Sequence, residues 1–210
     1  AALSTCVGAT ADLKTWSPSN GDISWHTATN WSPNGVPADG DDVQVYVPTF
    51  VTLDQDTENV RSLSISGGAY VTTFGHTLAV VDAGDALTSV TGDDTWLVVE
   101  PTGGTAFATD RLQLVAGGKL IMNGGHMIAV ALDNFDGFIE GSGEITVGSG
   151  DFNNGGLLRA SYGLLTLTGG LGSSVDLDGV VGSGAIQIDH ASELRVERPI
   201  TDPISTAVVL

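Results

Sequence analysis

Clusters of aspartate and asparagine are the first candidates for chemistry in this sequence. Apolar stretches are separated by the clusters ADGDD, DQD, GDD, DNFDG, GDFNN and DLDG. Carboxylate and amide oxygens in such loops are the ligands that Ca²⁺ prefers, although none of the clusters has EF-hand spacing. We expect the best calcium site, and calcium as the candidate cofactor, at Asp133, Asp136, Asp151 and Asn153. For any one cluster, the favoured interpretation is that these residues form turns and keep an exposed surface soluble.

Three of the four tryptophans form a second candidate site. Trp16, Trp25 and Trp31 lie within WSPSNGDISWHTATNWSPNG (16–35). Exposed indole rings in such a group would make a platform for a glycan. Buried rings would instead cover the apolar end of a repetitive fold, because a Trp side chain buries a large area and terminal repeats need a cap. The strand that follows favours the cap, with glycan contact as the alternative.

Residues suited to acid–base or nucleophilic catalysis do not form a recognisable group. Glu140 and Glu144 flank a Gly-Ser-Gly turn and are expected on neighbouring faces, at no separation useful to a glycosidase. His76 and His126 each follow a glycine and are expected at equivalent repeat positions, too far apart to share a metal ion. Cys6 has no histidine nearby in the sequence. The sequence predicts a protein that is not an enzyme, with a polysaccharide lyase as the residual alternative.

The charge balance excludes several classes of partner. The 210 residues include 25 Asp and Glu but only 7 Lys and Arg, which gives a net charge of −18. Nucleic acids and anionic membrane surfaces both require clustered cations, so neither is an expected partner. No apolar run approaches the roughly 18 residues of a membrane span. The single cysteine excludes an intrachain disulfide.

Strand-like alternation of apolar and polar residues runs through most of the chain, whereas helical spacing is nearly absent. Glycine is unusually frequent, with 29 residues, about twice the usual share. This composition predicts an all-β fold of short strands and tight turns. The expected strands are 43–47, 61–66, 69–74, 77–81, 95–100, 111–115, 119–122, 143–147, 164–169, 185–189 and 193–196.

Two internal repeats indicate how these strands are arranged. RSLSISGGAYVTTFGHTLAV (61–80) aligns without gaps with RLQLVAGGKLIMNGGHMIAV (111–130), an offset of 50 residues. DGFIEGSGEITV (136–147) resembles DGVVGSGAIQID (178–189), at an offset of about 42. Unequal offsets fit stacked coils of variable length. We therefore predict a parallel β-solenoid over 43–210 behind an N-terminal arm and Trp-rich cap over 1–42; the alternative is an antiparallel β-sandwich.

Three stretches carry a resemblance to bacterial secreted parallel β-helix proteins. NWSPNGVPADGDDVQVYV (30–47) and VTLDQDTENVRSLSISGGAYV (51–71) resemble the Trp-rich start and first coil of such proteins. NNGGLLRASYGLLTLTGGL (153–171) is similar to repeats of adhesins and autotransporter passengers. The resemblance implies a β-solenoid that is secreted or held at a bacterial cell surface. It implies little about activity, because this fold has many functions.

The expected function is that of a non-enzymatic structural or adhesive subunit of a surface layer, filament or matrix. Its expected partners are further copies of itself or other surface proteins. The apolar stretch ISTAVVL (204–210) and the arm AALSTCVGATA (1–11) would serve assembly, because an unpaired strand is a template for another chain. The alternatives are a carbohydrate-binding or lyase-type β-helix and an inert spacer of a longer adhesin.

Overall fold

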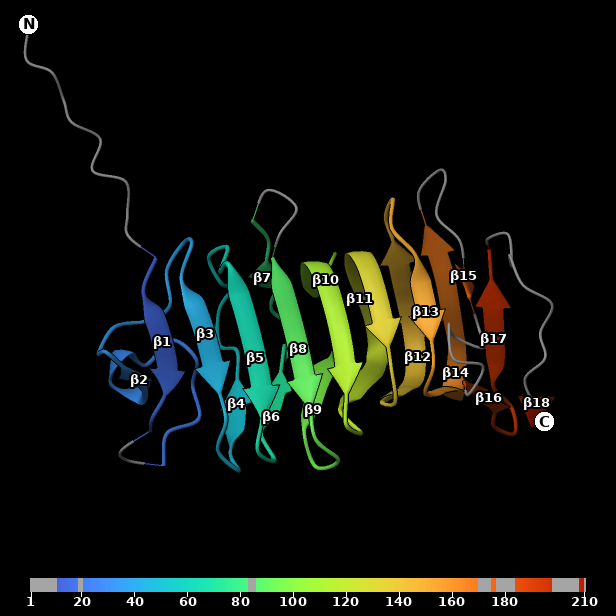
Figure 1. The fold of residues 1–210 in the computed structure, drawn as a ribbon, viewed down its shortest axis with the longest axis horizontal. Helices are drawn as coiled ribbons and strands as arrows, with labels where there is room; N and C mark the ends of the chain where they lie inside the picture. The colour runs from blue at the N-terminus through green and yellow to red at the C-terminus, as the bar shows by residue number, and fades with distance from the viewer. Residues whose placement is uncertain are drawn as a thin grey trace, which may run out of the picture.

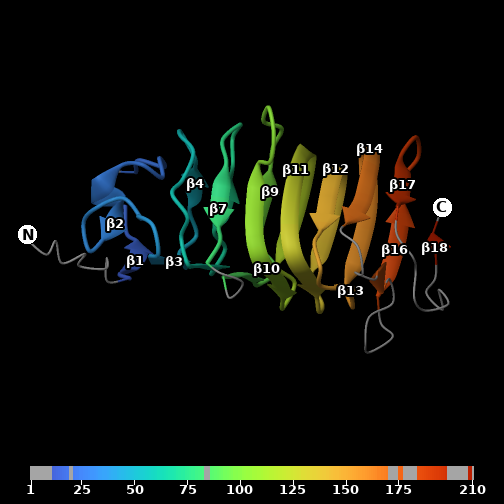
Figure 2. The same cartoon turned by 90° about the horizontal axis from the view of Figure 1, so that it is seen from above.

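The computed structural model describes residues 11–18, 21–82, 86–169, 175–176, 184–197 and 208–209. They form a β-solenoid of about six turns, in which almost all strand pairs are parallel. The rod axis runs from β1 to β17 in Figures 1 and 2. This confirms the predicted all-β solenoid and excludes the β-sandwich. The described residues contain one short 3₁₀ turn, η1 (Ala28–Asn30).

Three columns of strands, here called faces A, B and C, run along the rod. Face A consists of β1 (Leu13–Trp16), β3 (Asp42–Val45), β5 (Ser62–Ser66), β8 (Leu87–Thr91), the end of β10 (Phe107–Val115), the end of β11 (Lys119–Asn134), β13 (Phe152–Asn154) and β15 (Val175–Asp176). Face B consists of β4 (Phe50–Thr52), β6 (Tyr70–Thr72), β9 (Trp96–Val99), the starts of β11, β12 (Phe138–Val147) and β14 (Leu157–Gly169), β16 (Ala185–Ile188) and β18 (Val208–Val209). Face C consists of β7 (Leu78–Val80), the start of β10, the middle of β11, the ends of β12 and β14, and β17 (Glu193–Val196).

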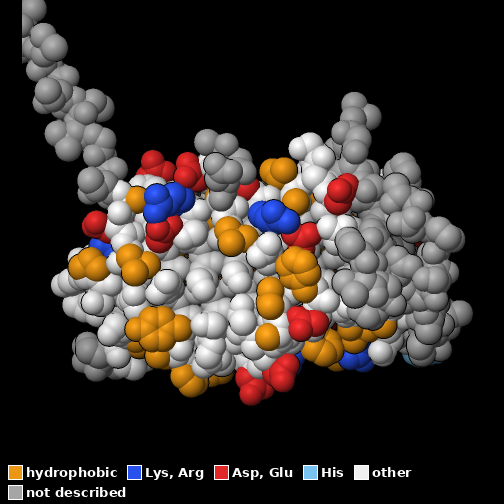
Figure 3. All heavy atoms as spheres, in the orientation of Figure 1, with side chains coloured by type: hydrophobic (Ala, Val, Ile, Leu, Met, Phe, Trp, Pro, Cys, Tyr) orange, Lys and Arg blue, Asp and Glu red, His pale blue; other side chains and the backbone are white. Residues whose placement is uncertain are grey.

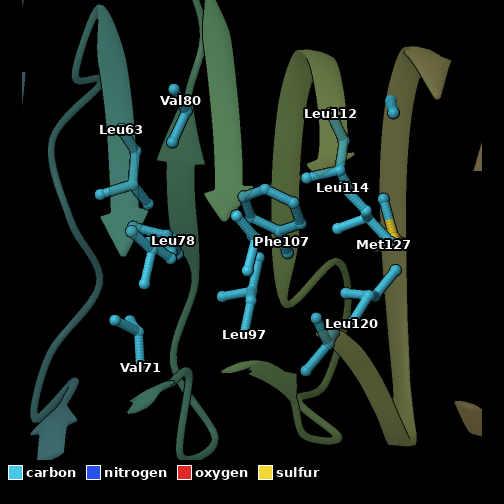
Figure 4. Packing of buried hydrophobic residues seen from close by; sticks show 14 of the residues in the cluster. Leu63, Val71, Leu78, Val80, Leu97, Phe107, Leu112, Leu114, Leu120 and Met127 are labelled. Carbon is cyan, nitrogen blue, oxygen red and sulfur yellow. The ribbon is translucent and has the colours of Figure 1, made fainter. Parts of the chain in front are cut away.

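The core is built from the inward half of each strand. In β5, for example, Leu63 and Ile65 are buried while the three serines that alternate with them face outward. Because parallel strands stack in register, each inward position becomes a continuous apolar column. Figure 4 shows such columns meeting along the axis, with Leu63, Leu112 and Leu114 from face A, Val71, Leu97 and Leu120 from face B, and Leu78, Val80, Phe107 and Met127 from face C.

Polar side chains inside the rod bond to one another. The hydroxyl oxygens of Thr88 and Thr109 lie 3.0 Å apart, and Asn134 donates to the Asn154 side-chain oxygen at 2.7 Å. All four residues are buried. Hydrogen bonds between successive coils offset the cost of burying these polar groups.

The expected alignment of the first repeat is wrong by one residue. It placed Leu78 on Ile128, two coils further along. In the structure Leu78 pairs with Phe107, and Phe107 pairs with Met127. A shift of one residue exchanges the inward and outward sides of every strand. The correct register therefore changes which side chains share an outward column.

Backbone conformation at the corner between faces A and B explains the error. Gly67 and Gly68 have φ of +68° and +83°, and the matching left-handed residues are Ala116 and Gly117, at +52° and +81°. The sequence alignment instead matched the pair Gly67-Gly68 with the pair Gly117-Gly118. Gly118 is needed for another reason, because a Cβ at this position would overlap the Val90 carbonyl oxygen.

The second repeat also has a different register from the one expected. Phe138 pairs with Leu157, and Leu157 pairs with Ala185. Residues 185–188 therefore lie on the column of 138–141, whereas the sequence alignment placed them on 144–147. Residues 178–183, which supported that alignment, lie outside the described residues.

Coil length varies along the rod while the columns stay continuous. On face A, Asp42, Ser62, Leu87, Arg111 and Ala131 occupy the same position in five successive coils. The turns that begin at Ser62 and at Leu87 are longer than those that begin at Asp42 and at Arg111. The extra residues lie in the connections between strands. Length variation is thus confined to the corners.

The N-terminal end of the rod has a different arrangement. Strand β1, within the segment 1–42 that the sequence assigned to the arm and cap, pairs in parallel with β3 and is the first strand of face A. It also pairs with β2 (Trp31–Ser32), in the antiparallel sense. Residues 1–10 of the predicted arm lie outside the described residues, as does the predicted C-terminal stretch except for 208–209.

Candidate ligand-binding pocket on face B

A hollow of about 450 Å³ lies on the outside of face B. Its apolar wall consists of Trp96, Ile121, Phe138 and Leu157. Its polar groups are those of Asp93, Lys119, Glu140 and Arg159. The pocket therefore combines aromatic rings with both signs of charge, as small-molecule sites commonly do. Figure 3 shows that charged and apolar side chains are also interspersed on the face of the rod that it presents.

Stacking of successive coils brings these residues together. Trp96, Lys119, Phe138 and Leu157 are consecutive residues of one outward column on face B. Ile121, Glu140 and Arg159 form the next outward column, two residues further along each strand. Two parallel columns thus make the two sides of the pocket.

Aromatic rings form a row that leads into the pocket from the N-terminal side. The ring centroids of Phe50 and Tyr70 are 5.1 Å apart, and those of Tyr70 and Trp96 are 6.2 Å apart. Burial in this row, followed by the charge of Glu100, raises the pKa of the Tyr70 hydroxyl. The next position in the column is Lys119 rather than a fourth ring.

Lys119 lies between two rings where the aromatic row is interrupted. Its Nζ is 4.5 Å from the centroid of Trp96 and 5.7 Å from that of Phe138. Such distances allow favourable cation–π interactions. The ammonium group is therefore held in the pocket by ring faces.

An ion-pair network forms the polar side. Arg159 donates to Asp189 at 2.7 Å and also lies 3.4 Å from Glu140. Hydrogen bonds from Arg159, and then from Gln187, hold the pKa of the Asp189 carboxyl below its ordinary range. These contacts fix a carboxylate and a guanidinium beside the apolar wall, where both can bond to a ligand.

The four predicted calcium ligands do not gather around one point. Asp133 is buried and paired with Arg111 at 2.6 Å, and it accepts a hydrogen bond from Asn153 at 2.7 Å. Asp136 accepts from the Ala116 backbone N–H at 2.5 Å. Within the described part of the chain, no group of three or more His, Cys, Asp or Glu side chains is placed to hold a metal ion. Asp151 takes part in an interaction of its own.

The three predicted tryptophans form one buried cluster at the N-terminal end. Trp16, Trp25 and Trp31 are each at most 3% exposed. Trp31 makes edge-on contacts with both others, at centroid distances of 4.9 and 4.8 Å, and its Nε1 donates to the Trp25 carbonyl at 2.7 Å. A glycan platform needs exposed ring faces, which these buried rings do not present. Their position is that of a cap.

The other singled-out residues lie apart. Glu140 lines the pocket on face B, whereas Glu144 belongs to face C, where it accepts a hydrogen bond from Thr168 at 3.1 Å. His126 bonds Thr146 at 3.0 Å. The corrected register does not align His126 with His76, which lies 3.8 Å from Asp56. Cys6 lies outside the described residues.

Sequence reasoning missed the row on face B. The expected alignment matches Tyr70 with Leu120, an inward residue, and no aromatic column emerges. In the observed register, Tyr70, Trp96 and Lys119 all occupy the first position of their strands. The signal was therefore present in the strand starts of YVTTF, WLVVE and KLIM.

No helix among the described residues has the length and apolar character needed to cross a membrane. Comparison of the chain with protein-family models, with curated proteins and with solved structures finds no match.

Proposed function

We propose that this chain is a non-enzymatic structural and adhesive protein of the cell surface or its surroundings. In this proposal the solenoid is a stiff rod and face B attaches it to a ligand on another surface. The observation that carries the proposal is the position of the pocket. It lies on the side of the rod, at the end of an outward aromatic row, where a binding partner has access without reaching the core.

The contacts of the pocket support binding rather than catalysis. Glu140 lies 3.4 Å from the Arg159 guanidinium in the wall of the pocket. A glycosidase needs two carboxyl groups on either side of the same glycosidic bond. Glu144, the other member of the pair singled out in the sequence, lies on a different face. These two carboxylates are therefore poorly arranged for hydrolysis of a glycosidic bond.

Adhesion of protein-coated beads to a panel of bacterial cells tests the proposal. Phe138→Ser removes a ring from the pocket, and we expect it to reduce the number of attached beads at least fivefold. The matched control is Phe135→Ser, because Phe135 is 52% exposed but does not line the pocket. The proposal fails if wild-type beads attach no better than albumin-coated beads, or if both variants attach equally well.

A second candidate function is assembly of the rod through one end. Among the described residues, β17 has one partner strand in register, β14, and β18 has one, β16, whereas the Trp cluster covers the other end. Such edge strands accept a further strand from another chain. Light scattering in calcium and then in EDTA tests this function. Particles well above 21.4 kDa in both solutions support strand-mediated assembly, loss of these particles in EDTA supports an ion-assisted one, and a monomer in both excludes it.

A further inference from the structure

Lys119 differs from the other basic residues that the structure describes. The arginines are all paired with carboxylates, in the pairs Arg61–Asp42, Arg111–Asp133, Arg159–Asp189 and Arg195–Glu193. Lys14 is buried and donates to the Pro33 carbonyl at 3.5 Å. The Lys119 side chain has no ion pair or hydrogen bond with any described residue, and its ammonium lies against the rings of Trp96 and Phe138.

This free cation is unusual in a chain with a net charge of −18. Asp93 and Glu140 line the same pocket, yet neither has a carboxylate oxygen within 4.0 Å of the Lys119 ammonium. The ring contacts hold the ammonium in place without neutralising its charge. One positive charge is therefore available to a ligand that enters the pocket.

The remaining groups define the rest of the ligand. The apolar wall of Trp96, Phe138 and Leu157 suits the carbon skeleton of a ring. Glu140 accepts hydrogen bonds and Arg159 donates them, which suits hydroxyl groups. A volume of about 450 Å³ accommodates one or two sugar rings.

We propose that the face B pocket binds a sugar unit that carries a single carboxylate within an otherwise neutral glycan. The carboxylate bonds to Lys119, the ring lies against Trp96 and Phe138, and the hydroxyls bond to Glu140 and Arg159. This inference rests on the proposed adhesive function and names the ligand class of the same site.

The surrounding charges limit the ligand to one acid group. Asp93, Glu140 and the overall negative charge repel additional anionic groups on neighbouring sugars. A polymer with a carboxylate on every unit would meet this repulsion along the whole rod. The site is therefore expected to prefer a glucuronate–glucose disaccharide to a polyuronate.

Isothermal titration calorimetry and ligand-detected NMR test the proposal with three probes: a glucuronate–glucose disaccharide, the neutral glucose disaccharide, and a uronate tetramer. We expect the wild-type chain to bind the first at least tenfold more tightly than either of the others. We expect the preference over the neutral sugar to shrink between 0.05 and 0.5 M NaCl, because salt screens an exposed charge pair.

Two variants with the same charge change separate the pocket from the charge of the whole molecule. Lys119→Met keeps the aliphatic stem and removes the charge, and we expect at least a tenfold loss of affinity for the acidic disaccharide. Arg61→Met removes one positive charge on face A and should bind as the wild type does. Circular dichroism spectra identify a variant that fails to fold, and Lys119→Gln then replaces Lys119→Met.

The outcomes separate the two proposals. Equal affinity for acidic and neutral sugars, or unchanged binding by Lys119→Met, overturns the role of Lys119. A preference for the tetramer overturns the single-acid ligand. If no sugar binds while Phe138→Ser still abolishes bead adhesion, the ligand class is wrong and the adhesive function stands. If bead adhesion fails but the disaccharide binds through Lys119, the pocket stands without the adhesive function.

Discussion

The molecule uses aromatic side chains in two contrasting ways, at its N-terminal end and on face B. Trp16, Trp25 and Trp31 are buried and meet edge to face. Tyr70 and Trp96 are only partly buried, follow the strand spacing and point outward, with Lys119 as the next member of their row. The first group excludes water from the end of the core, whereas the second places partly exposed rings and one cation on the outside of the rod.

The difference shows that a cluster of aromatic residues in the sequence and an aromatic surface in the structure need not coincide. The three clustered tryptophans are close in the sequence because they belong to one short cap. The members of the face B row, such as Phe50, Tyr70 and Trp96, are well separated in the sequence, since each comes from a different coil. A solenoid builds its surfaces from such distant residues.

The largest expected effect compares the loss of stability in the buried tryptophan cluster with the loss in the outward row on face B. We expect Trp31→Ala to lower the free energy of unfolding by about 3–5 kcal/mol, because it leaves a cavity between two other rings. We expect Trp96→Ala to cost about 1 kcal/mol, since it removes ring contacts on the surface. Urea denaturation followed by circular dichroism measures both. Equal losses for the two variants would contradict the contrast between cap and row.

A second test concerns the register that creates the row. Gly67→Ala should cost about 1–3 kcal/mol, because its Cβ would overlap the Tyr46 carbonyl oxygen at a positive φ. Ala116→Gly, at the matching position two coils later, should stabilise by about 1 kcal/mol, because glycine relieves a left-handed alanine. The same denaturation experiment gives both values. Destabilisation by Ala116→Gly would argue against the register that matches these two positions.

A third test fills the break in the row. Lys119→Phe places a ring between Trp96 and Phe138, and we expect stability to change by no more than about 0.5 kcal/mol, since ring contacts replace cation–π contacts of similar strength. Binding of the glucuronate–glucose disaccharide should be lost. Thermal denaturation and calorimetry measure the two effects. Retained binding would show that the cation is not required.

The smallest expected effect concerns the polar wall of the pocket. Because Arg159 lowers the pKa of Asp189 in the folded chain, this pair stabilises the fold above the ordinary pKa of 3.8 and loses its effect as the pH falls below it. Arg159→Met and Asp189→Asn should each weaken the dependence of the urea midpoint on pH below about 4. The two variants should give the same result. If both keep the wild-type dependence of the urea midpoint on pH, the ion pair of Arg159 and Asp189 is not the source of that dependence.

Much of the fold follows from the sequence, but the candidate site does not. Alternation in stretches such as SLSIS determines the strands, and Gly-rich corners with two internal repeats indicate stacked coils. The register was the weak step, because Ala116 adopts a conformation that glycine usually takes. Local residue preferences could not reveal this substitution, since its conformation depends on the coils above and below.

The residues predicted for calcium and for glycan contact do not line the pocket, for a related reason. Asp133 looked like a metal ligand among its neighbours in the sequence, yet Arg111, one coil earlier, pairs with it. No sequence motif marks Lys119 as a binding residue. Its environment is formed by Trp96 and Phe138, which belong to adjacent coils. Interactions between coils decide both cases, and their partners are identified only when the register is known.

Variation in coil length has a consequence for how such a rod changes in evolution. Shorter and longer turns stack on one another because the surplus residues leave the columns at the corners. Gly103 and Gly104 lie in one of these connections, where a Cβ would have no neighbour within 4 Å. Insertions in such a connection would disturb no packed side chain. A single residue inserted within a strand, in contrast, would turn the core side chains of that strand outward. In a family of such proteins, new segments would be inserted at the corners, and the strand columns would be conserved.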